Sequence, residues 1–178
     1  GDVAALFGKA KNKADYCLMK TLFAGLFFEK EEARFIDNFR ANVESLNDPY
    51  KRALALAVMN RSLTRKVTMG HFAHTQALAY ANDPARIKRN RSLVRPVRDI
   101  FLDLLPLYNA AVFDNGRKNK SYGSNVLSLL PALPDVDLAY FDPPYCGSHA
   151  DYQSFYHLLE TYTEYWKDKQ FVNGTRRY

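Results

Sequence analysis

The sequence has few cysteines and no long apolar run. Its 178 residues include two cysteines, Cys17 and Cys146, which are too few for a disulfide framework and lack a metal-ligand spacing. No signal peptide and no apolar run of about 18 residues is present, so we expect a soluble, cytoplasmic protein. The chain begins with Gly1 and not with Met, which suggests an excised or processed fragment.

Histidine is also sparse. His71 and His74 are three residues apart, but no third ligand is near them in the sequence, so we expect no metal site. The chain is 47% hydrophobic, which is typical of a folded globular protein. Its 25 basic and 19 acidic residues give a net charge of +6, which is compatible with a nucleic-acid partner.

Apolar residues recur at helical spacing in several segments. Helices are predicted over residues 31–46, from Pro49 to about Asn60 with Asp48 as cap, over 100–105 with a stop near Pro106, and over 152–166 with Asp151 as cap. In the last of these, the aromatic stripe that includes Tyr152, Phe155 and Tyr156 is predicted to pack in the core, with His157 in a structural role. A strand is predicted over residues 110–113.

The most distinctive segment is Val136–Tyr145. Residues 136–141 are mostly apolar and predict a buried strand, which is followed by Asp142, Pro143, Pro144 and Tyr145. Open α/β sheets bind their ligands at the carboxyl ends of their strands. The two prolines hold their carbonyls stiffly, because their φ angles are nearly fixed. A carboxylate, a carbonyl acceptor and an aromatic face so close together suit a planar base with an exocyclic amino group.

Asp142-Pro143-Pro144-Tyr145 resembles the catalytic motif of amino-methyltransferases that modify DNA at adenine N6 or cytosine N4. Residues 137–141 before it and 150–157 after it resemble the adenine-specific branch. The resemblance covers roughly residues 20–170 and implies an α/β fold, with part of a Rossmann-like methyltransferase sheet and a helical, basic insert. Residues 1–109 would be the helical, basic region with DNA-recognition elements, and residues 110–178 part of the catalytic domain.

The resemblance also implies a cofactor, S-adenosylmethionine, and no metal. Asp142 and Asn125 would bind the cofactor; Asn125 stands where the family commonly has an acid that meets the adenine amino group of the cofactor. The Phe-x-Gly-x-Gly turn of the family is absent, since none of the eight glycines are paired at that spacing. We therefore expect the turn to lie before Gly1 and the fragment to bind cofactor poorly and to be inactive alone.

A dense run of basic residues precedes the motif. Six cations lie between Arg86 and Arg98 with no acid among them. They either form a solvated helix face or contact the phosphates of double-stranded DNA, and the resemblance favours phosphate contact. The predicted DNA-binding residues are Arg86, Lys88, Arg89, Arg91, Arg95 and Lys118.

These observations predict an enzyme that flips adenine out of DNA and methylates its N6 amino group, for restriction-modification or genome marking. Transfer to cytosine N4 is a close alternative, because both bases present an amino group. Methylation of guanine in RNA accords less well with the long basic insert. A non-catalytic nucleic-acid-binding remnant, or an unrelated basic α/β domain, are the remaining alternatives. The sequence gives neither the DNA recognition sequence nor the oligomeric state.

Overall fold

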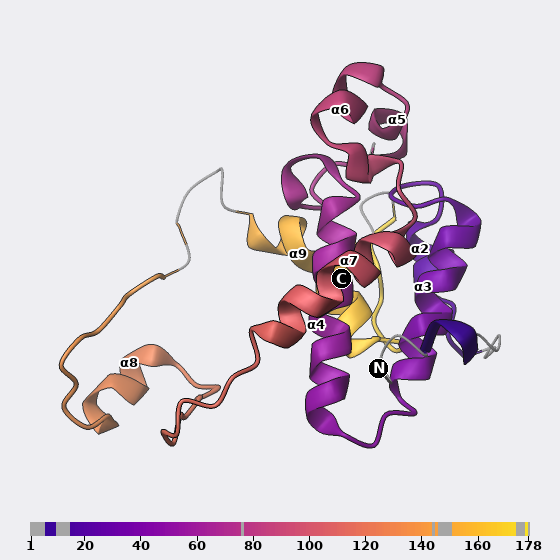
Figure 1. Ribbon diagram of the computed structural model, residues 1–178. Helices are drawn as coiled ribbons and strands as arrows, with labels where there is room; N and C mark the ends of the chain where they lie inside the picture. Colours follow the sequence, from indigo (N-terminus) through magenta and orange to yellow (C-terminus); the bar gives the residue numbers. More distant parts are fainter. Residues whose placement is uncertain are drawn as a thin grey trace. The chain divides into compact units, whose positions relative to one another are not determined.

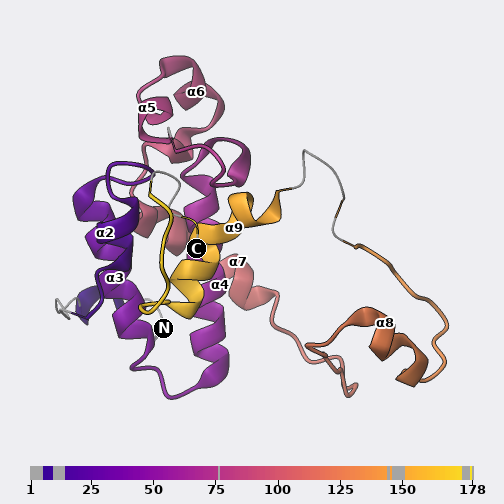
Figure 2. The same ribbon diagram turned by 180° about the vertical axis from the view of Figure 1, so that it is seen from behind.

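The computed structural model describes residues 6–9, 15–75, 77–143, 145, 151–173 and 177. Two compact units form, one from Gly1–Ala111 with Asp151–Tyr178 and the other from Val112–Ala150. In chain order the helices are η1 (Leu6–Lys9), α2 (Leu18–Phe23), α3 (Lys30–Val43), α4 (Pro49–Arg65), η2 (Thr68–Gly70), α5 (Ala77–Ala81), α6 (Pro84–Arg89), η3 (Arg91–Leu93), α7 (Val97–Ala110), α8 (Val126–Leu129), η4 (Leu130–Ala132) and α9 (Tyr152–Glu164) (Figures 1 and 2). The described residues contain no strand, only an isolated bridge between Ala24 and Phe28.

The predicted pair of helices at residues 31–60 is confirmed as α3 and α4. Ile36, Phe39 and Val43 form the buried face of α3. Asp48 caps α4, since its carboxylate accepts hydrogen bonds from the backbone N–H groups of Tyr50 at 2.8 Å and Lys51 at 3.2 Å. The helix continues to Arg65, past the predicted end, because its C-terminal turns still bury apolar side chains in the core.

The predicted stop at Pro106 is wrong, because α7 continues through it to Ala110. A proline inside a helix leaves the carbonyl four residues earlier, that of Leu102, without its helical partner. Pro106 is exposed and Leu102 is 36% exposed, so water can hydrate this carbonyl. The opposite side of α7 packs on α4 and buries Ile100 and Leu104. The packing of that side offsets the lost hydrogen bond.

The helix predicted at residues 152–166 is confirmed as α9, but its predicted core face is wrong. Tyr152 and Tyr156 are 36% and 39% exposed. The buried face instead carries Ser154, His157, Leu158, Thr161 and Tyr162, and it faces the core beside α4. The helix backbone satisfies some of the polar groups on this face, whereas the His157 Nε2 atom and the Tyr162 hydroxyl have no hydrogen-bond partner among the described residues. The hydroxyl of Thr161, for example, donates to the carbonyl of His157 at 2.7 Å.

A buried polar network holds the N-terminus of α2 against α3 and the end of α9. The Asp37 carboxylate accepts hydrogen bonds from the backbone N–H groups of Met19 and Lys20, each at 2.9 Å, and from the Tyr165 hydroxyl at 2.7 Å. The same hydroxyl accepts the N–H of Leu18 at 3.1 Å. Burial raises the pKa of Asp37, and the hydrogen bonds from Tyr165, Lys20 and Met19 oppose part of this rise.

Arg40 satisfies the carbonyls at the C-terminal end of α9. Its guanidinium donates to the carbonyls of Tyr162 at 3.1 Å and Thr163 at 3.0 Å, and it pairs with Glu44, the residue that follows α3. The last carbonyls of a helix have no partner within the helix, so a buried cation there stabilises the end. Tyr165, which follows α9, has a left-handed φ of 52°.

The second unit contains α8 and η4, and its other described residues are irregular and, apart from the half-buried Leu133, exposed. Neither predicted strand is present. Ala110 is the last residue of α7, and the described residues at 112–113 and 136–141 belong to no element. The backbone groups of a strand need a neighbouring strand, and no described segment provides one. In the described part of the chain, the two apolar segments therefore form no sheet.

Candidate functional site

The motif predicted to be catalytic lies in the second unit and is open to solvent. Asp142 and Pro143 are exposed, Tyr145 is 71% exposed, and Pro144 lies outside the described residues. Among the described residues, none forms a hydrogen bond or ion pair with the Asp142 carboxylate. A carboxylate without such a partner has its acceptor sites available for donors on a ligand.

Asn125, the predicted cofactor ligand, caps α8. Its side-chain oxygen accepts the backbone N–H of Leu127 at 2.9 Å. An amide oxygen has two lone pairs, so one acceptor site remains for a ligand. Asn125 and Asp142 can supply acceptors, but the chain has no paired glycines to hold the methionine part of S-adenosylmethionine. The residues present therefore match an amino-group substrate and do not make a complete cofactor site.

The six predicted DNA-binding residues fall into two groups. Arg86 pairs with Asp83 at 3.3 Å, and its guanidinium lies 4.0 Å from the ring centroid of Tyr80. Arg95 pairs with Asp103 at 2.8 Å. Both side chains therefore have partners within the fold, and their charges are partly neutralised there.

Lys88, Arg89 and Arg91 are exposed, and no described acid lies within ion-pair distance of them. They lie on α6 and η3, which follow one another in the chain. Lys118 is also exposed, in the second unit. Unpaired exposed cations contact an anionic backbone without first breaking an internal ion pair. We call Lys88, Arg89 and Arg91, which have no acidic partner among the described residues, the free cations of the α6–η3 segment.

Arg65, which was not among the predicted DNA-binding residues, lies beside this segment in the structure. The side-chain N–H of Asn90 donates to the carbonyl of Arg65 at 3.3 Å, so the exposed end of α4 lies beside the segment between Arg89 and Arg91. The sequence signal was the basic triplet Arg61, Arg65 and Lys66. Side-by-side placement with a segment 25 residues later in the chain could not be predicted from it.

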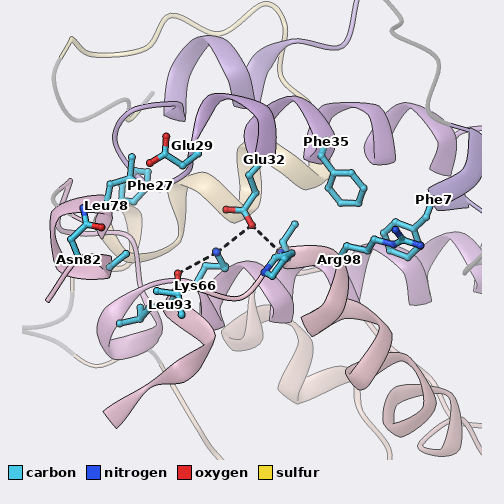
Figure 3. A pocket seen from close by; sticks show the side chains of 14 residues that line it. Phe7, Phe27, Glu29, Glu32, Phe35, Lys66, Leu78, Asn82, Leu93 and Arg98 are labelled. Atoms are coloured by element: carbon cyan, nitrogen blue, oxygen red, sulfur yellow. Dashed lines mark hydrogen bonds and ion pairs between the residues drawn. The ribbon is translucent and has the colours of Figure 1, made fainter. Parts of the chain in front are cut away.

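Lys66, the third of that triplet, is buried. Its ammonium pairs with Glu32 at 3.2 Å and donates to the carbonyl of Leu93 at 3.2 Å (Figure 3). It also donates to the carbonyl of Arg95 at 2.7 Å. Glu32 also accepts the backbone N–H of Val97 at 2.9 Å. Lys66 therefore fixes the end of α4 to the segment before α7 and is not available to a ligand.

A cavity of about 710 Å³ in the first unit lies over this ion pair. Phe27, Phe35 and Leu78 form its apolar walls, and Glu29 and Arg98 also line it (Figure 3). Its volume is in the range of small-molecule sites. None of the predicted catalytic or DNA-binding residues lines it. The charges of Glu32 and Lys66 neutralise one another within the cavity wall.

His71 and His74 lie together on the surface, with ring centroids 5.7 Å apart, and His71 stacks on Phe155 at 4.4 Å. Burial and the neighbouring His74 lower the pKa of His71. In the described part of the chain, no three potential metal ligands of the His, Cys, Asp or Glu type come together. None of the helices in these same segments is long and apolar enough to cross a membrane.

Comparison with known proteins gives one functional indication. The chain is 36% identical over 146 residues to a protein from Haemophilus parahaemolyticus named Type II methyltransferase M2.HphI. The similarity covers 79% of the chain but only 43% of that protein, so the chain spans less than half the length of this relative. No family model and no solved structure matches the chain.

Proposed function

We propose that the protein is an S-adenosylmethionine-dependent methyltransferase that modifies the N6 amino group of adenine in double-stranded DNA. The observation that carries this proposal is the sequence Asp142-Pro143-Pro144-Tyr145, with an exposed carboxylate that no described residue binds. Similarity to a Type II methyltransferase over 79% of the chain supports the reaction class. A restriction-modification or genome-marking role in the cytoplasm follows from this class of reaction.

Asp142 and Pro143 act on the amino group. The nitrogen of adenine N6 is a weak nucleophile, because its lone pair is delocalised into the ring. The Asp142 carboxylate and the Pro143 carbonyl each accept one N–H, which favours a pyramidal nitrogen with a directed lone pair. Pro144 has no N–H that could compete for these acceptors. When bound, S-adenosylmethionine would supply the methyl group from its sulfonium and leave as a neutral thioether, and the methylated nitrogen would lose one proton.

Tyr145 stacks on the target base. The amino group is unreachable inside a duplex, so the base leaves the stack at a cost of roughly a few kcal/mol. Stacking on an aromatic side chain returns about 1–3 kcal/mol for each base. The exposure of Tyr145, at 71%, leaves its ring accessible to such a base.

We also propose that residues 136–141 form one strand of the predicted Rossmann-like sheet. Val136, Leu138, Tyr140 and Phe141 are each between 64% and 86% exposed, although their side chains are apolar or aromatic. Such a run is stable as a strand when both faces are covered, as in parallel sheets. We assign residues 136–141 to a strand that pairs within the complete catalytic domain and presents Asp142 at its end. Asn125 would then meet the adenine part of the cofactor.

Nucleoside analysis tests the function. DNA from a host that produces the complete protein is digested to nucleosides and examined by mass spectrometry, with DNA from the same host without the protein as control. New N6-methyladenine is the expected product. N4-methylcytosine would instead establish the alternative target, to which the same motif is suited. DNA binding by the complete protein without either product would indicate a non-catalytic remnant.

A further inference from the structure

Met69 has a backbone conformation that its side chain does not explain. Its φ is 66°, in the left-handed region, and the next residue, Gly70, has a φ of 74°. Glycine adopts this region freely, but a residue with a Cβ does so only at a cost in free energy. Met69 is 81% exposed, so packing of its side chain contributes little to offset that cost. Backbone outliers of this kind often lie at binding sites.

The turn that carries Met69 is fixed at both ends. Before it, Lys66 is held by its buried ion pair with Glu32, and Val67 is 3% exposed. After it, Phe72 is 1% exposed and its backbone N–H donates to the carbonyl of Phe155 on α9 at 3.0 Å. An exposed apolar side chain is therefore held outward from a firmly anchored turn.

The same turn lies beside cations. A Cβ placed on Gly70 would lie 3.9 Å from the carbonyl oxygen of Thr64, so the turn folds back on the last residues of α4. The next carbonyl, that of Arg65, is the one that Asn90 binds. Met69 and the segment with the free cations therefore meet at one end of α4, which lies toward α6 in Figure 1.

We propose that Met69 is an apolar wedge that enters the DNA duplex and occupies the space left by the extruded base. This inference rests on the proposed function. An unbranched thioether side chain adapts to an irregular apolar gap between base pairs, and apolar wedges that unstack base steps are a recurrent device of DNA-bending proteins. Arg65, Arg89 and Arg91 hold the phosphates beside the wedge.

Glycine and leucine at position 69 separate a wedge from a purely structural residue. Met69→Gly removes the side chain and suits the left-handed backbone, so the fold is kept and the melting temperature is unchanged or higher. Met69→Leu keeps an apolar side chain of similar size. Tyr50→Ala removes another exposed side chain, 84% exposed, at the opposite end of α4, and serves as the matched control.

The probe is an unmethylated DNA duplex that contains the sequence the protein acts on, with 2-aminopurine in place of the target base. The fluorescence of 2-aminopurine rises when it leaves the base stack. Met69→Gly is expected to lose most of this rise and to methylate the paired duplex about tenfold more slowly, in keeping with the loss of one stacking contact. Its rate should recover on a duplex in which the target base is mispaired, because less energy is needed for extrusion. Met69→Leu and Tyr50→Ala should resemble the unchanged protein.

Equal fluorescence and equal rates for Met69→Gly and the unchanged protein would overturn the wedge while leaving the proposed function intact. All of these measurements use the complete protein. If the complete protein methylates no DNA, the proposed function fails, and the wedge is rejected with it.

Discussion

The free cations make a quantitative prediction for DNA binding. Lys88, Arg89 and Arg91 are exposed and without described acidic partners, whereas Arg86 and Arg95 form ion pairs at 3.3 Å and 2.8 Å. Each phosphate neutralised on B-form DNA contributes about −0.9 to the slope of log K against log salt concentration. Replacing the three free cations by Gln should therefore make the slope shallower by about 2.7.

The assay measures the affinity of the protein for a fluorescently labelled duplex by anisotropy over a series of salt concentrations. Between about 50 and 200 mM salt, three contacts change the binding constant roughly 40-fold, and the triple variant should lose that part of the salt dependence. The double variant Arg86→Gln, Arg95→Gln is the matched control, because the charges it removes have partners inside the fold. Its slope should change by less than about 1, since it loses no full phosphate contact.

Equal slopes for the triple variant and the unchanged protein would refute the assignment of the free cations to phosphates. An equal effect of the control would show that the ion pairs seen in the structure do not decide which cations contact DNA. Thermal unfolding of each variant checks that the helical unit is intact. We expect unchanged melting temperatures, because α6 and η3 contribute little to the buried core.

Two further predictions concern the fold. Tyr165→Phe should lower the free energy of unfolding in urea by about 1–3 kcal/mol, because Asp37 loses a donor and the Leu18 N–H loses its acceptor. The control is Tyr16→Phe, which alters a ring whose centroid lies 4.6 Å from that of Tyr165 and should lower the free energy of unfolding by less. An equal loss for the two variants would contradict the hydrogen-bond network. Burial lowers the pKa of His157 below 6.5, so its contribution to stability is complete above that pH and is lost as the pH falls toward the lowered folded-state pKa. His157→Gln should therefore lose less stability than the unchanged protein between about pH 7 and 5, and an identical pH dependence would refute this.

The helices could be predicted where local signals agree. Asp48 followed by Pro49, and Asp151 before the aromatic stripe, mark starts that the structure confirms, because caps depend on residues only a few positions away. The stop at Pro106 could not be predicted correctly. Whether a helix continues through a proline depends on the packing of its other face, which here comes from α4.

The core face of α9 also required tertiary information. The aromatic stripe was the more apolar choice, but the structure buries Ser154, His157 and Thr161 instead. The helix backbone bonds the Thr161 hydroxyl and the His157 Nδ1 atom, while the His157 Nε2 atom has no hydrogen-bond partner among the described residues. Likewise, the basic residues predicted a charged surface, but not which of them form ion pairs within the fold. The partners of Arg95 and Lys66 come from other helices, so no local pattern identifies them. The chemical role of the motif at Asp142 stays a prediction.

The most direct test of the central claim is methyl transfer by Asp142 variants of the complete protein. Radiolabelled S-adenosylmethionine reports transfer to duplex DNA, and anisotropy reports DNA binding in the same samples. Asp142→Ala and Asp142→Asn should lower transfer by about 10²- to 10³-fold, the effect of removing one preorganised polar group, with DNA affinity unchanged. Full transfer by either variant would contradict the assignment of Asp142 as the acceptor that holds the amino group.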